Sequence, residues 1–350
     1  MKAAISIEHP AWSHQFKNII QRINEDGETL VLGVNKERDL ELLDTFGIKY
    51  ERVAESTGIG VLQKGWLFIK LCFVYTRRVR RFNPDILIGG ASPMMAVAAW
   101  LTRKPHVIFE DTEVSKFSLN ICRMFSTCIM TPQTFLWDLG KKHLRTPIYK
   151  ELFYLHRDFK PNPDVLRQNG IDPDRPFALV RFVAWNASHD VGMRGLSDED
   201  KIRFVKKVEE LMPVYISSES ELPEALKGYQ YTLPFDQVHH LLYYATLVFS
   251  EGKTVASEAA MLGTYAFYLN QIESGPTNEQ EARFQLLRCL PDPATRYETA
   301  LAEATELLKD SSLWERGKEK RERLLDEMPN PNELYWNQMM EALSTYDVKR

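Results

Sequence analysis

One segment of the chain brings together small, polar and acidic residues in an order that could bind phosphate. The apolar run at 245–249 is predicted to form a short buried strand, and the turn after it contains Ser250, Gly252, Lys253 and Thr254. Backbone N–H groups at the start of the next helix lack intrahelical partners, and the helix dipole favours an anion there. Glu258 falls about one turn into this helix, where its carboxylate could accept hydrogen bonds from ribose hydroxyls. The alternative is an ordinary strand-helix-strand unit with a solvated Glu258.

A second group of polar residues follows the predicted strand at 177–182. The guanidinium of Arg181 could pair with a diphosphate, Trp185 could stack on a base or sugar, and His189 could contact a phosphate or transfer a proton. The alternative is a rigid connection in which Asp190 caps the following turn.

Carboxylates and imidazoles follow two predicted strands in the first half of the chain. Glu110, Asp111 and Glu113 come directly after one strand, and Glu8, His9 and His14 lie just after the first strand. Neighbouring carboxylates raise one another's pKa, and histidine titrates near neutral pH, so both groups could act as general acids or bases. The alternatives are a solvated acidic loop that caps the next helix and a pair of surface histidines.

The elements that would position these residues alternate between strand and helix. In the first half, strands are predicted at 3–7, 29–34, 49–53, 85–88, 106–109 and 128–130, with helices at 13–25, 38–46, 65–82 and 93–101. In the second half, strands are predicted at 177–182, 214–217, 229–231, 245–249 and 265–269, with helices at 198–211, 235–244, 293–308, 313–327 and 332–344. Ser13 is the predicted N-cap of the first helix. This rhythm predicts an α/β fold with doubly wound parallel sheets, which bind ligands at the carboxyl ends of their strands.

Length and composition set limits on the function. A chain of 350 residues suits two domains, and its net charge of −4 gives no overall electrostatic case for nucleic acid. The four cysteines show no zinc spacing, and no metal is expected. The N-terminus is unlike a signal peptide and no apolar stretch reaches about 18 residues, so we expect a cytoplasmic protein. The helix at 65–82 is apolar around its circumference, which predicts a buried helix with at most peripheral membrane contact.

Over nearly its full length the chain resembles a family of uncharacterised archaeal and bacterial proteins that share a domain of unknown function. The matching segments are 89–93, 109–113, 149–156, 180–190 and 257–264. That family is GT-B-like, which implies two Rossmann-like domains facing a central cleft.

The turn and helix at 250–263 are also similar to the donor site of two GT-B-like families. These are the N-acetylglucosaminyltransferase of peptidoglycan synthesis and the non-hydrolysing UDP-N-acetylglucosamine 2-epimerase. In both, the turn contacts the donor diphosphate and a glutamate binds the ribose. The resemblance implies these roles for the turn residues named above and for Glu258. The loop after Arg181 matches the epimerase pattern loosely, because it lacks the tandem arginines.

We therefore expect a Rossmann-like domain at 1–158 that binds an acceptor and carries the catalytic groups. A second such domain at 159–330 would bind a nucleotide sugar, and a helix at 331–350 would cross back to the first. The expected activity is transfer of a sugar from a UDP donor to a glycan or lipid-linked acceptor, as in polysaccharide biosynthesis. The base would be Glu110, Asp111, His9 or His14. One alternative is a nucleotide-sugar 2-epimerase that uses the carboxylates at 110–113 with His189. The other is a non-catalytic nucleotide-sugar-binding protein.

Overall fold

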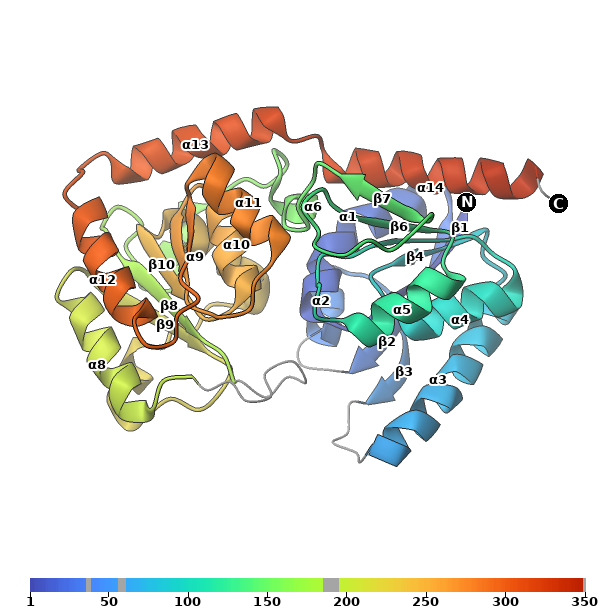
Figure 1. Ribbon diagram of the computed structural model, residues 1–350, viewed down its shortest axis with the longest axis horizontal. Coiled ribbons are helices and arrows are strands. Elements are labelled where there is room, and N and C mark those ends of the chain that lie inside the picture. Colours follow the sequence, from blue (N-terminus) through green and yellow to red (C-terminus); the bar gives the residue numbers. More distant parts are fainter. Residues whose placement is uncertain (36–38, 56–60, 185–194, 349–350) are drawn as a thin grey trace. The chain divides into compact units, whose positions relative to one another are not determined.

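The computed structural model describes residues 1–35, 39–55, 61–184 and 195–348. It divides into two compact units, both layered α/β structures (Figure 1). The first unit holds Met1–His156 and Met328–Arg350, and the second holds Arg157–Glu327. The chain therefore leaves the first unit after residue 156 and returns to it at residue 328.

The first unit is built on a seven-stranded parallel sheet in the order β3-β2-β1-β4-β5-β6-β7. The strands are β1 (Lys2–Ile7), β2 (Glu28–Asn35), β3 (Glu51–Glu55), β4 (Ile86–Gly89), β5 (His106–Phe109), β6 (Cys128–Pro132) and β7 (His143–Thr146). Both β4 and β5 are buried along their whole length, because a parallel sheet is covered by helices on both faces. The strand order reverses between β1 and β4, which makes this pair the switch point where ligands bind in such sheets.

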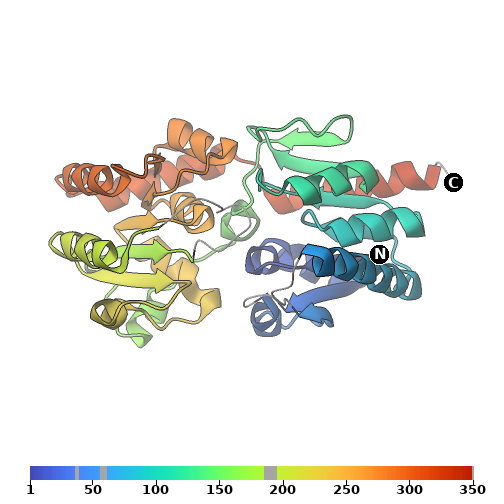
Figure 2. The same cartoon turned by 60° about the horizontal axis from the view of Figure 1, so that its bottom comes forward.

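Two helical layers pack against this sheet (Figure 2). One contains α1 (Pro10–Asp26), α2 (Asp39–Thr45), α6 (Leu152–Leu155) and α14 (Pro331–Val348). The other contains α3 (Val61–Phe82), α4 (Pro93–Thr102) and α5 (Lys116–Phe125). Right-handed crossovers on either side of a switch point place their helices on opposite faces.

Helix α14 is connected to the sheet of the first unit by two hydrogen bonds of the buried Tyr335 side chain. The hydroxyl of Tyr335 donates to the Val107 carbonyl at 2.7 Å and accepts from the Gly89 amide at 3.1 Å. A residue more than two hundred positions away in the sequence thus satisfies backbone groups of β4 and β5.

The second unit has a five-stranded parallel sheet in the order β12-β11-β10-β8-β9. The strands are β8 (Ala178–Phe182), β9 (Val214–Ser218), β10 (Leu247–Ser250), β11 (Tyr265–Tyr268) and β12 (Leu287–Cys289). Its helices are α7 (Pro163–Gln168), α8 (Asp198–Glu209), α9 (Val238–Tyr244), α10 (Lys253–Met261), α11 (Gly275–Phe284), α12 (Arg296–Leu307) and α13 (Leu313–Glu327). The strand order reverses between β8 and β10. In the core, Phe249 stacks on Phe267 with ring centroids 5.2 Å apart.

The doubly wound α/β fold is confirmed, but several predicted elements are wrong. Residues 229–231 are not a strand: a 3₁₀ helix ends at Tyr229, and Gln230 forms an isolated bridge to Ile216. The helix predicted to begin at Ser13 begins at Pro10, with His9 as its N-cap. Proline at the first helical position is pre-organised for the helix, which explains the earlier start.

The prediction that the helix at 65–82 is buried is also wrong. Tyr75 and Val79 of α3 are buried, whereas Trp66, Ile69 and Phe73 are 76%, 61% and 69% exposed. Phe68, Leu71, Cys72 and Phe82 pack against the core together with Tyr75 and Val79, so one face of α3 is buried along the helix and the opposite face is exposed. Among the described residues, the helices contain no stretch long and apolar enough to cross a bilayer.

Candidate functional site

A carboxylate surrounded by hydroxyl groups lies at the switch point of the first unit. Oε1 of Glu8, directly after β1, accepts a hydrogen bond from the Ser6 hydroxyl at 2.6 Å and another from Ser92 in the turn after β4. The Tyr75 hydroxyl lies 3.5 Å from the same oxygen. Burial and the charge of Glu8 raise the pKa of the Tyr75 phenol well above its usual value. These hydroxyls hold the carboxylate at the edge of the sheet where ligands bind.

Glu110 ties together the loops that follow β4 and β5. Its Oε2 accepts from the Ala91 amide at 3.1 Å, and its Oε1 accepts from the amides of Asp111 and Thr112 at 3.1 and 3.0 Å. Burial, and next the charge of Asp111, raise the pKa of the Glu110 carboxyl. Both oxygens are therefore used in holding backbone.

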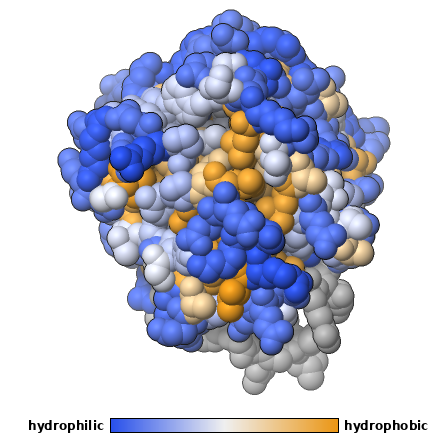
Figure 3. All heavy atoms as spheres, turned by 90° about the vertical axis from the view of Figure 1, so that its left-hand side faces the viewer, coloured by the Kyte–Doolittle hydropathy of each residue, from blue (hydrophilic) through white to orange (hydrophobic). Residues whose placement is uncertain are grey.

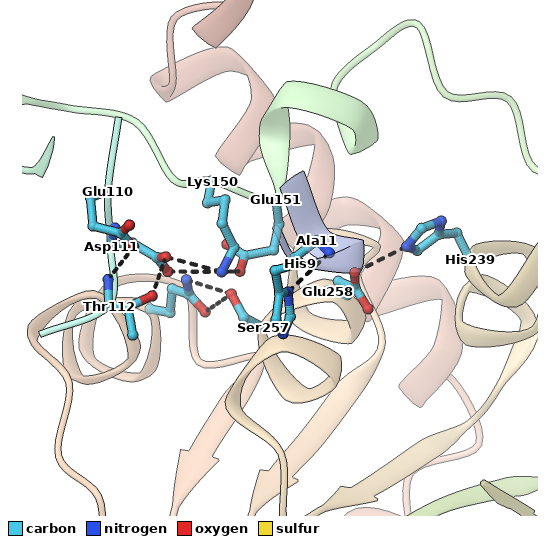
Figure 4. A network of polar contacts seen from close by, with 11 residues as sticks. His9, Ala11, Glu110, Asp111, Thr112, Lys150, Glu151, His239, Ser257 and Glu258 are labelled. Carbon is cyan, nitrogen blue, oxygen red and sulfur yellow. Dashed lines mark hydrogen bonds and ion pairs between the residues drawn. The ribbon is translucent and has the colours of Figure 1, made fainter. Parts of the chain in front are cut away.

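Asp111 forms a buried ion pair with a lysine that lies 39 residues further along the chain (Figure 4). The two carboxylate oxygens lie 3.0 and 3.2 Å from Nζ of Lys150, and the Glu151 carboxylate lies 3.7 Å from the same nitrogen. Burial alone would lower the pKa of Lys150, but Asp111 and Glu151 outweigh it and raise that pKa above its usual value. The lysine is therefore charged and pairs with the Asp111 carboxylate.

The histidines expected beside these carboxylates have different environments. His9 is exposed, and its Nδ1 accepts from the Ala11 amide at 3.1 Å, so a neutral ring carries its proton on Nε2 and presents a donor. His14 is buried, with its ring centroid 5.3 Å from those of Phe46 and Tyr154. His189 and its neighbour Trp185 lie outside the described residues.

In the second unit, the turn predicted to hold phosphate is stabilised by hydrogen bonds between the Ser250 hydroxyl and the backbone of Gly252. The Ser250 hydroxyl is fully buried, donates to the Gly252 carbonyl at 2.8 Å and accepts from the Gly252 amide at 3.1 Å. Gly252 is the N-cap of α10 and has no side chain to cap the first helical turn. Lys253 and Thr254, both partly exposed, begin the helix. The start of α10 thus faces the switch point without a capping side chain, as an anion site requires.

Glu251, which was not among the predicted site residues, stabilises this switch point by hydrogen bonds to several neighbouring segments. Its Oε2 accepts from the Val183 amide at 2.9 Å and its Oε1 from the Tyr297 hydroxyl at 2.6 Å. Its carbonyl accepts from the Asn270 side chain at 2.8 Å. Burial and the charge of Glu251 raise the pKa of Tyr297. The segments after β8, β10 and β11 are thereby held together around Glu251, through its carboxylate and its backbone carbonyl.

Glu258 lies one turn into α10 and is nearly buried beside a histidine. Its Oε1 is 3.1 Å from Nε2 of His239, which comes from α9 (Figure 4). On the same helix, Ser257 is buried and bonded to Gln280 of α11. Glu258 therefore has a fixed orientation close to the start of α10.

The Arg181 side chain points toward β9, away from the turn at Ser250 and the start of α10. Its guanidinium donates to the Ser217 hydroxyl and to the Glu219 carboxylate, both at 2.6 Å. These partners belong to β9 and the loop after it, whereas β10 and α10 lie on the other side of β8. The predicted pairing of Arg181 with a diphosphate would therefore compete with an ion pair that already exists.

A cavity of about 1080 Å³ lies elsewhere in the second unit, and none of the predicted site residues lines it. Its wall includes Tyr265, Leu286 and Leu287 at the amino ends of β11 and β12, together with Leu307 of α12. Figure 3 shows the face that α8 and α12 form, on which apolar side chains lie between charged ones. Because ligands of such sheets bind at the carboxyl ends of strands, we place the functional site at the switch points instead.

Lys150, His239 and Glu251 were not among the predicted site residues, and Glu8 was predicted as an acid/base candidate with its neighbouring histidines but not among the four expected bases. The carboxylate Glu251 stands directly after a predicted strand, which was a usable signal. Lys150 pairs with Asp111 and His239 with Glu258, and both partners are distant in the sequence, so no local pattern predicts these contacts. Among the described residues, no group of three or more His, Cys, Asp and Glu side chains is arranged to hold a metal ion.

No family model and no curated protein matches the chain, so membership of the domain-of-unknown-function family stays a prediction. Solved structures do match. The UDP-GlcNAc 2-epimerase from Neisseria meningitidis bound to UDP-GlcNAc is 12% identical, with a TM-score of 0.70 over 97% of this chain and 100% of that one.

Two glycosyltransferases match to a similar extent. The spinosyn forosaminyltransferase SpnP is 13% identical, with a TM-score of 0.66 over 98% of this chain and 99% of that one. The glycosyltransferase VinC, in complex with dTDP, is 13% identical, with a TM-score of 0.64 over 99% and 100% of the two chains. At such low identity these likenesses concern the fold alone. The chain therefore has the GT-B fold that 2-epimerases and glycosyltransferases share.

Proposed function

We propose that this protein is an enzyme that acts on a nucleotide sugar, with a UDP-linked sugar bound by its second unit. The observation that carries the proposal is the uncapped start of α10 at the β8–β10 switch point, with Glu258 one turn further on. The helix N-terminus would hold the diphosphate, and Glu258 would accept hydrogen bonds from the ribose hydroxyls. UDP, UDP-GlcNAc and VinC's ligand dTDP, which are bound in matched structures, all contain a nucleoside diphosphate, which supports this choice of ligand.

The reaction we propose is transfer of the sugar to an acceptor hydroxyl. The acceptor oxygen would bond to the anomeric carbon as the bond from that carbon to the diphosphate oxygen breaks. The hydroxyl proton would pass to a carboxylate of the first unit, and the charge left on the diphosphate would be stabilised by the start of α10. Among the carboxylates after β1 and β5, Glu8 suits the role of base best. Glu110 holds backbone through both oxygens, and Asp111 is paired with Lys150.

Epimerisation at C2 of a UDP sugar is the second candidate, because several matched structures are UDP-GlcNAc 2-epimerases. Product analysis with UDP-GlcNAc alone separates the two. Formation of the C2 epimer would support epimerisation, whereas slow release of UDP that an acceptor accelerates would support transfer. Calorimetry that detects no binding of UDP or another nucleoside diphosphate would overturn both.

Replacing Glu258 with alanine is expected to weaken UDP binding. Loss of charged hydrogen bonds to the ribose costs about 1.5–3 kcal/mol, roughly a 10- to 150-fold higher Kd. Isothermal titration calorimetry measures this directly. The matched control is Ser257→Ala, one residue away and bonded to Gln280, which should leave the affinity close to the original value. A folded Glu258→Ala variant with unchanged affinity would remove the ribose assignment.

A further inference from the structure

The helical layer formed by α3, α4 and α5 differs in charge from the rest of the protein. These helices of 22, 10 and 10 residues contain eight Lys or Arg and no Asp or Glu, although the whole chain has a net charge of −4. All 48 acidic residues therefore lie elsewhere. This layer is a concentrated positive region on an otherwise acidic protein, which attracts anionic partners.

Large apolar side chains are exposed on the same layer. Trp66, Ile69 and Phe73 follow one another at spacings of three and four residues, so they form a single stripe along α3, and each is more than 60% exposed. The ring of Phe68 contacts Phe117 of α5 at 5.6 Å, and Phe117 is itself 62% exposed. Phe68 belongs to the inner face of α3, which packs against the core, so this contact places the exposed ring of Phe117 next to α3.

Basic side chains extend this stripe toward the end of α3. Arg77 and Arg80 lie four and seven residues after Phe73, on the same helical face, and Arg81 is beside them. All three are exposed. Arg78, by contrast, forms an ion pair with Glu51 of β3. The outer face of α3 thus presents aromatic and aliphatic groups followed by three arginines.

We propose that this face binds peripherally to the surface of an anionic lipid bilayer. Trp66 and Phe73 would enter the boundary between headgroups and acyl chains, and the arginines would pair with lipid phosphates. A second copy of the chain is a poorer occupant. Two such layers would bring like charges together with no acidic residue on either helix layer to pair with them.

The proposal does not rest on the proposed function. If both proposals hold, the reaction takes place close to the membrane surface. The helix α3 runs antiparallel to the strands it joins, so its Trp66 end lies toward the carboxyl ends of the first sheet, the edge where Glu8 is found.

Co-sedimentation with vesicles tests the proposal. The full chain is expected to bind vesicles that contain phosphatidylserine and not vesicles of pure phosphatidylcholine, and high salt should release it. Changing Arg77, Arg80 and Arg81 together to Gln should weaken partitioning by about 100-fold, since each basic residue near the surface contributes about 1 kcal/mol, a factor of about 5. Trp66→Ser with Phe73→Ser should also abolish most binding.

The matched control is Met340→Ser, which removes an apolar side chain that is 45% exposed on α14 and should leave vesicle binding unchanged. Several results would overturn the proposal. These are no binding of the folded protein to anionic vesicles, equal binding by the arginine and aromatic variants, or a dimer in sedimentation velocity that the aromatic variant dissociates. Displacement from vesicles by single-stranded RNA that binds through the same residues would also overturn it.

Discussion

Asp111→Ala is expected to lower the free energy of unfolding of the first unit by about 3–5 kcal/mol. The substitution leaves Lys150 nearly buried with its charge, because the carboxylate oxygens that lie 3.0 and 3.2 Å from its Nζ are gone. Removing one partner of a buried pair costs far more than removing both. Urea denaturation of the full chain measures the effect as a lower transition midpoint.

The double variant Asp111→Ala/Lys150→Met is the control for this interpretation. It removes both charges, so it should regain much of the stability that the single variant loses. UDP binding, assigned to the second unit, should be unchanged in every folded variant. Equal stability of Asp111→Ala and the wild-type protein would show that the pair does not hold the loop after β5.

Glu8→Gln is expected to reduce turnover by about 10²- to 10⁴-fold, the usual contribution of a general base. Glutamine has the same shape, and its carbonyl oxygen still accepts from Ser6 and Ser92, so the switch point should keep its structure. The affinity for UDP should not change. Release of UDP from a UDP sugar, with water or a supplied acceptor, gives the rate.

Glu28→Gln is the matched control, since Glu28 is a carboxylate of the same unit that pairs with Lys2 at the amino ends of β1 and β2. Its turnover should equal that of the wild-type protein. Full activity in Glu8→Gln would exclude Glu8 as the base and return attention to Glu110 and His9.

Much of the fold could be predicted because parallel strands buried on both faces form apolar runs that stand out in the sequence. The predicted strands at 106–109 and 265–269 correspond to β5 and β11 within one residue. The short strands β7 and β12 were missed because they carry polar residues such as His143 and Arg288. Edge strands need less apolar surface, so periodicity is weak there.

The sequence predicted where the candidate site residues lie on the sheets, but not which side chains they pair with. Residues directly after strands, such as Glu110 and Gly252, lie where a doubly wound sheet must place them. Which of them touch one another depends on tertiary packing. The sequence favours Arg181 as a phosphate ligand, yet its guanidinium forms an ion pair with Glu219, 38 residues away. Likewise, His9 caps a helix because Pro10 starts that helix early.

The return of α14 to the first unit has a consequence for the order of synthesis. Ribosomes deliver residues 157–327 before residues 331–348, so the second unit is complete while Gly89 and Val107 still lack the Tyr335 hydroxyl. A chain truncated after residue 327 would therefore contain the whole second unit and a first unit that lacks α14. The first unit, whose synthesis begins before that of the second, is thus completed only by a helix that is translated after the second.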